Sequence, residues 1–76
     1  MVELLEYIAK AIVTNKDDVT IRTEETESMT VLHLSVNSED MGQIIGKQGR
    51  VIQAIRAIIK TASRGGERRY SVEVDE

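Results

Sequence analysis

The sequence contains no cysteine and no proline, and Tyr7 and Tyr70 are its only aromatic residues. Without cysteine the chain can form neither a disulfide nor a thiolate metal site, which suits a reducing compartment. The shortage of aromatic residues argues against RRM and OB modules, because both use aromatic side chains as stacking platforms for bases. Low-complexity tracts and internal repeats are also absent, so we expect one continuous domain over residues 1–76.

Long apolar runs are absent as well. None approaches the roughly 20 residues that span a bilayer, and the first residues include Glu3 and Glu6 where a signal peptide needs a basic region. We therefore expect a cytoplasmic protein that does not contact a membrane. A chain of 76 residues can bury a small core, but it is too short for the deep, multi-loop cleft of many enzymes.

Residue types suited to catalysis are few and poorly placed. His33 is the only histidine, and alternation along its segment puts it opposite the predicted core face, so we expect an exposed strand histidine rather than a catalytic base. The adjacent acids Glu39 and Asp40 are typical of the first turn of a helix. We predict no catalytic residue, no metal site and no cofactor, and therefore no enzyme.

Charge is distributed unevenly along the chain. The formal net charge is −3, but residues 1–40 hold three bases against nine acids, whereas residues 41–76 hold seven bases against four acids. No acid occurs in the 26 residues from 41 to 66. An exposed helix face normally mixes charges of both signs, so this pattern indicates an anionic partner. Cations near a helix C-terminus are the alternative explanation, and they account for Lys60 and Arg64 only.

Hydrophobic periodicity predicts two long helices and three strands. Apolar residues recur at helical spacing over residues 2–14 and 50–64. They alternate with polar residues over residues 19–22, 29–36 and 69–74. The first two strands can pair as an antiparallel hairpin, and a helical crossover favours a parallel third strand. The sequence therefore predicts an α+β fold, with three helices packed on one face of a three-stranded mixed sheet.

A short helix is predicted over residues 39–45, between the second strand and the second long helix. Ser38 suits its N-cap, and Gly46 ends it. Asn15 is predicted to end the first helix in a left-handed conformation. The element order becomes α-β-β-α-α-β.

The most informative motif is the pair Gly46 and Gly49, which enclose Lys47 and Gln48 and precede Arg50. Glycines adopt backbone conformations closed to other residues, and they have no Cβ atom to hold a polyanion away. If a helix begins after Gly49, its unpaired N–H groups and positive dipole end face the same ligand. A Walker A loop is excluded by spacing, because three residues rather than four separate Gly42 from Gly46.

Residues 44–52, Ile-Ile-Gly-Lys-Gln-Gly-Arg-Val-Ile, resemble the I-G-x-x-G-x-x-I core of KH domains. The α-β-β-α-α-β order resembles their type II, prokaryotic arrangement, and the length resembles the small bacterial single-KH proteins of the KhpA type. This resemblance implies binding of single-stranded RNA, with the loop gripping the backbone of about four nucleotides and an aliphatic groove holding their bases. It also implies the last strand, near Arg68 and Arg69, as the opposite wall of the groove.

The predicted RNA-binding residues are therefore the loop, its aliphatic flanks and the nearest polar side chains. They are Ile45, Gly46, Lys47, Gln48, Gly49, Arg50, Ile52, Gln53, Arg56, Arg68 and Arg69.

A second hypothesis concerns protein partners. Ile58 and Ile59 are adjacent on one helix, and both cannot point into so thin a core, so one of them is a candidate for a dimer interface. The alternative is a broad core stripe. The KhpA-type resemblance implies a homodimer, or a heterodimer with a larger RNA-binding protein that has its own KH domain. In this hypothesis the chain is chiefly an interaction subunit and contacts RNA secondarily.

Overall fold

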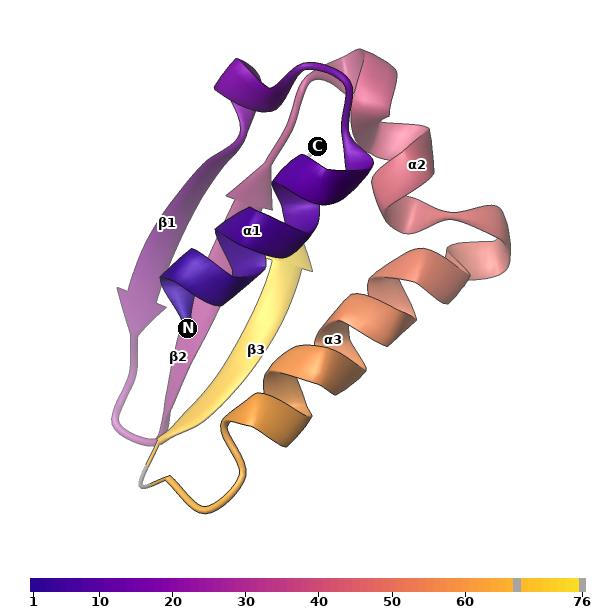
Figure 1. The fold of residues 1–76 in the computed structure, drawn as a ribbon. Coiled ribbons are helices and arrows are strands. Elements are labelled where there is room, and N and C mark those ends of the chain that lie inside the picture. Colours follow the sequence, from indigo (N-terminus) through magenta and orange to yellow (C-terminus); the bar gives the residue numbers. More distant parts are fainter. Residues whose placement is uncertain (67, 76) are drawn as a thin grey trace.

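Three helices pack on one face of a three-stranded sheet in the computed structural model, which describes residues 1–66 and 68–75 (Figure 1). The elements are, in chain order, α1 (Val2–Ile12), β1 (Thr20–Glu25), β2 (Met29–Ser35), α2 (Met41–Ile45), α3 (Arg50–Ala62) and β3 (Arg69–Val74). Single 3₁₀ turns precede β1, α2 and α3, and they are η1 (Lys16–Asp18), η2 (Ser38–Asp40) and η3 (Lys47–Gly49). The predicted fold class and element order are confirmed.

The strand order is β1-β2-β3, with β1 antiparallel and β3 parallel to the central strand. Leu32 of β2 stands opposite Val72 of β3, and Leu34 lies two residues further along the same face. All three side chains are buried, and the helices cover them. The predicted hairpin and parallel crossover are therefore both present.

The core consists of aliphatic side chains from every layer. Burying one such side chain contributes roughly 1.5–3 kcal/mol. The buried hydrophobic residues are Leu5, Ala9, Val13, Val19, Leu32, Leu34, Ile44, Ile52, Ile55, Ile59 and Val72. Three of them come from α3 and one from α2, so the segment on each side of Gly46 is anchored in the core.

The end of α1 differs from the prediction. The helix stops at Ile12, and Asn15 has φ −91°, which is not left-handed. A distant carboxylate holds the chain here instead, because Asp40 accepts hydrogen bonds from Thr14 N at 3.1 Å, Asn15 N at 3.0 Å and Asn15 Nδ2 at 3.0 Å. Asp40 lies in the first turn of η2, as predicted, but it is only 3% exposed and also acts as a buried tether.

Two further predictions need correction. The turn η2 is capped by Asn37 rather than Ser38, since Asn37 Oδ1 accepts a hydrogen bond from Glu39 N at 2.8 Å. His33 lies on the outer face of the sheet as predicted, but it is buried, with Nε2 2.8 Å from Glu24 Oε1 and Nδ1 3.4 Å from Asp75 Oδ1. The hydrogen bond with Glu24 raises the pKa of His33 above its ordinary value.

Candidate nucleic-acid interface

The turn between α2 and α3 depends on Gly46. Its backbone has φ 77° and ψ 173°, a combination that is essentially restricted to glycine. A Cβ atom at this position would lie 2.7 Å from Val51 Cβ and 2.8 Å from Val51 N. The backbone of α2 therefore runs directly against the first turn of α3, and a larger residue would separate the two helices.

Two more of the four turn positions have positive φ angles. Gly49 has φ 75° and ψ 14°, and Gln48 has φ 58° and ψ 27°. A residue with a side chain pays about 1–2 kcal/mol for this conformation, so Gln48 stores strain in the loop. The consequence is a tight protrusion in which Lys47 and Gln48 are both exposed.

Positive charge gathers where α3 begins. Arg50 is exposed, and one of its terminal amino groups donates to Gln48 Oε1 at 3.4 Å. The first turn of α3 adds backbone N–H groups and the positive end of the helix dipole. Lys47, Arg50 and this helix end thus offer donors to one anion, and a phosphate group fits that chemistry.

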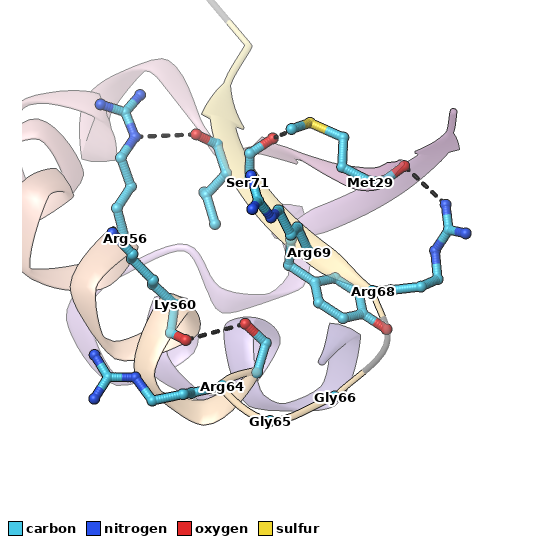
Figure 2. A pocket seen from close by; sticks show the side chains of 12 residues that line it. Met29, Arg56, Lys60, Arg64, Gly65, Gly66, Arg68, Arg69 and Ser71 are labelled. Carbon is cyan, nitrogen blue, oxygen red and sulfur yellow. Dashed lines mark hydrogen bonds between the residues drawn. The ribbon is translucent and has the colours of Figure 1, made fainter. Parts of the chain in front are cut away.

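Beyond the loop, the space between α3 and β3 has mixed polarity. Ile45 is partly buried and Ile52 is 5% exposed, so Ile52 supports the loop from the core and shows little surface. Gln53 is exposed. Arg56 crosses from α3 to the edge strand, where its Nε donates to the carbonyl oxygen of Val72 at 3.0 Å (Figure 2).

The two arginines predicted on the opposite wall lie in different surroundings. Arg69 is exposed at the start of β3. Arg68 turns toward the β1–β2 hairpin, as Figure 2 shows for its bond to Met29. It donates from Nη2 to the carbonyl oxygens of Thr26 and Met29, both at 2.8 Å, and from Nε to Thr30 Oγ1 at 2.9 Å. Three hydrogen bonds give Arg68 a structural role at the hairpin.

A pocket that the sequence did not indicate lies at the far end of α3 from the loop. It has a volume of about 580 Å³ and is lined by Lys60 and Arg64 as well as by Arg56 and Arg69. The i,i+4 spacing of Arg56, Lys60 and Arg64 was the available signal, since residues four apart share a helix face. The sequence could not show that β3 closes the other side.

The two candidate dimer residues, Ile58 and Ile59, differ in their exposure to solvent. Ile59 is fully buried in the core and is not available to a partner, whereas Ile58 is 46% exposed. Ile58 lies in a shallow hollow of about 400 Å³ with Ala57, Thr61 and Ala62. The prediction of an interface therefore rests on Ile58 alone.

The part of the chain that the structure describes contains neither a metal-ligand cluster nor a membrane-spanning helix. Within residues 1–66 and 68–75, no three histidine, cysteine or acidic side chains are grouped as metal ligands. No helix in the same ranges has the length and apolar character needed to cross a membrane.

Comparison with known proteins identifies the same family, the KH domains, that the loop sequence resembles. A family model described as the KH domain of KhpA/KhpB matches residues 2–74. The RNA-binding protein KhpA of Clostridium acetobutylicum is 45% identical over 74 residues, covering 97% of this chain and 99% of the relative. RNA-binding protein KhpA from Listeria monocytogenes is 40% identical over the full length of both chains, and that from Treponema pallidum is 38% identical over 95% of this chain and 90% of its own. The chain therefore belongs to the KhpA/KhpB family of KH domains.

Proposed function

We propose that this protein binds single-stranded RNA, with the Gly46–Gly49 loop gripping the backbone of about four nucleotides. The observation that carries the proposal is the loop geometry. Gly46, Gln48 and Gly49 have positive φ angles, and the turn that they form projects Lys47 and Gln48 outward, beside Arg50 and the N-terminus of α3. The names of the relatives support RNA as the ligand, because they are called RNA-binding proteins.

The base-binding part of the proposed site is the space between α3 and β3. Arg56 spans it, and its bond to Val72 uses Nε only, which leaves the two terminal amino groups to meet a base or a phosphate. Gln53 lies one turn closer to the loop and adds an amide. We expect modest affinity that falls as salt rises, because phosphate contacts supply much of the binding free energy.

The test is the double substitution Lys47→Asp with Gln48→Asp. Both side chains are exposed, and aspartate tolerates the left-handed conformation at position 48, so the fold should persist. We expect RNA binding to weaken by more than about tenfold at about 0.1 M salt, because two negative charges replace a phosphate contact. Electrophoretic mobility shift with single-stranded RNA measures the effect, and circular dichroism confirms the fold.

A matched control changes the net charge by the same amount away from the loop. Lys10 lies on α1 beside Glu6, and Ser28 is exposed in the β1–β2 turn. Lys10→Asp with Ser28→Asp should bind RNA nearly as well as the unchanged protein. Equal binding by the loop variant and the unchanged protein would overturn the proposed function.

A second function is favoured by the exposure of Ile58. We propose that the hollow around Ile58 contacts a second copy of the chain or the KH domain of a larger RNA-binding protein. The cytoplasmic location of the protein stays a prediction from the sequence. Pairing two weak RNA sites would increase avidity on a longer RNA without any new contact.

Ile58→Asp tests this surface. An aspartate there would place an uncompensated charge in the interface, so we expect a self-associating protein to become a monomer of 8.5 kDa. Size-exclusion chromatography with light scattering gives the mass. Tyr7→Ser is the control, because Tyr7 is 75% exposed and does not line the hollow. A monomeric unchanged protein at high concentration would rule out the homodimer.

A further inference from the structure

His33 is a buried titratable residue that the proposed RNA site does not use. It lies in the central strand β2, on the face of the sheet that the helices leave open (Figure 1). Only 10% of its side chain is exposed, and both of its ring nitrogens face carboxylates. Nε2 lies 2.8 Å from Glu24 Oε1 of β1, and Nδ1 lies 3.4 Å from Asp75 Oδ1, just beyond β3. The ring therefore links the central strand to segments on both sides of it.

This arrangement requires a protonated ring. An ionised carboxylate accepts hydrogen bonds and cannot donate them, whereas a neutral imidazole has only one N–H group. Both carboxylates can be bonded only when both ring nitrogens carry a proton, and that ring is the imidazolium cation. In a neutral ring, the lone pair of one nitrogen would face a carboxylate oxygen. The geometry thus fits one protonation state of His33 and disfavours the other.

The other charges that face His33 come from the same two neighbouring strands. Arg22 of β1 and Glu73 of β3 stand directly opposite it in the sheet, and both are exposed. The hydrogen bond with Glu24 favours the cation most and Asp75 adds to it, whereas burial and Arg22 oppose it. The balance raises the pKa of His33 above its ordinary value of 6.5. At pH 6.5 the imidazolium is therefore more populated in the folded protein than in the unfolded chain.

Asp75 is the weaker end of this link, because its contact with the ring is the longer of the two. Its backbone N–H donates to the carbonyl oxygen of Leu34 at 2.8 Å, which continues the parallel ladder one step past the end of β3. A neutral ring with its proton on Nε2 would keep the bond to Glu24 and turn a lone pair toward Asp75. Loss of the ring proton therefore acts on the last step of this ladder.

We propose that His33 is a pH-sensitive clamp on the C-terminal end of β3. As an imidazolium it ties Asp75 to the sheet, and loss of its proton releases Asp75 while the contact with Glu24 stays. The clamp is independent of the Gly46–Gly49 loop and goes beyond RNA binding. It also makes stability depend on pH. A group whose pKa is raised by folding stabilises the folded state below 6.5, and this contribution is lost as the pH rises through the folded value.

NMR titration from about pH 5 to about pH 9 tests the clamp, because His33 is the only histidine and its ring signals are unambiguous. We expect the ring to titrate at a higher pH in the folded protein than in the urea-unfolded chain. The amide signal of Asp75 should shift with the same midpoint, and its ¹H–¹⁵N NOE should fall above that midpoint. Equal midpoints in the folded and unfolded chains, or an Asp75 signal that does not follow the ring, would refute the clamp.

Two variants remove one carboxylate each. Glu24→Gln and Asp75→Asn change exposed side chains, so both proteins should fold. Each should lower the midpoint of His33, and Glu24→Gln should lower it more because its bond is shorter. Glu73→Gln is the matched control, since it removes the same charge from the residue opposite the ring and leaves both hydrogen bonds in place. If Glu73→Gln lowers the midpoint as much as Asp75→Asn does, net charge explains the shift and the clamp is refuted.

Urea denaturation at several pH values gives a second measurement. Between pH 6.5 and the folded midpoint, the unfolding equilibrium constant of the unchanged protein should rise by up to about tenfold per pH unit, because unfolding releases one proton. The double variant Glu24→Gln with Asp75→Asn should show no such rise, since neither carboxylate then favours the imidazolium. A rise of equal steepness in the double variant would contradict the proposal.

Discussion

Replacing Gly46 with alanine is expected to destabilise this fold by a large fraction of its free energy of unfolding. A residue with a Cβ atom is strained at φ 77° and ψ 173°, and the new atom would overlap the backbone nitrogen and side chain of Val51. Backbone strain of about 1–3 kcal/mol and overpacking of about 1–3 kcal/mol add to a loss of about 2–6 kcal/mol. A domain of 76 residues has an expected stability of roughly 4–11 kcal/mol.

Gly49→Ala is the matched control in the same loop. Gly49 is also left-handed, but a Cβ atom there would lie 4.0 Å from its nearest neighbour, Ile52 Cγ2. Only the backbone cost of about 1–2 kcal/mol remains. Urea denaturation of the three proteins gives the free energies of unfolding. Equal losses for the two alanine variants would show that the contact between Gly46 and Val51 does not determine the difference.

Gly46→Ala and Gly49→Ala should both weaken RNA binding, although they differ in their effect on stability. Gly49→Ala places a methyl group on the loop surface, where a phosphate would approach, without unfolding the domain. A protein that is folded but binds RNA weakly is therefore expected for Gly49→Ala. Gly46→Ala loses binding because the angle between α2 and α3 changes.

Local chemistry was sufficient to predict the loop from sequence. Gly46 ends α2 and Gly49 precedes α3 because each takes a conformation that favours glycine, and this depends on nearby residues only. The two long helices and three strands were also predicted, because their apolar patterns have the right periods. Fold and loop position thus followed from the sequence.

Long-range contacts account for the features that the sequence did not predict. Nothing near Asn15 shows that a carboxylate 25 residues away holds its backbone. His33 is buried because Glu24 and Asp75 reach it from two other segments, and alternation alone could give only its face. The pocket beyond Arg56 also depends on a long-range contact. Lys60 lines a cavity only because β3 lies beside α3.

The same contacts predict that Asp40→Asn destabilises the protein strongly, although the two side chains have nearly the same shape. Asp40 Oδ1 accepts from Thr14 N, and Oδ2 accepts from the backbone and side-chain nitrogens of Asn15. An asparagine must turn an NH₂ group toward one of these donors, which leaves a partly buried N–H without an acceptor. We expect the melting temperature to fall by about 10 °C or more, measured by thermal denaturation.

Glu39→Gln is the control for charge, because Glu39 is exposed in the same turn. It should change the melting temperature little, since an exposed carboxylate contributes little by itself. A similar drop in both variants would mean that the charge near α2 matters and the tether to Asn15 does not.

The pH dependence gives an independent test of the tether. The backbone hydrogen bond from Asn15 holds the pKa of Asp40 below its ordinary value of 3.8. A carboxyl group whose pKa is lowered by folding stabilises the folded state above 3.8, and this contribution is lost as the pH falls through the lower, folded value. The unchanged protein should therefore lose stability on acidification below about pH 3.8, and Asp40→Asn should lose less over the same range. Parallel acid transitions for the two proteins would show that Asp40 is not held as an ionised acceptor by Thr14 and Asn15.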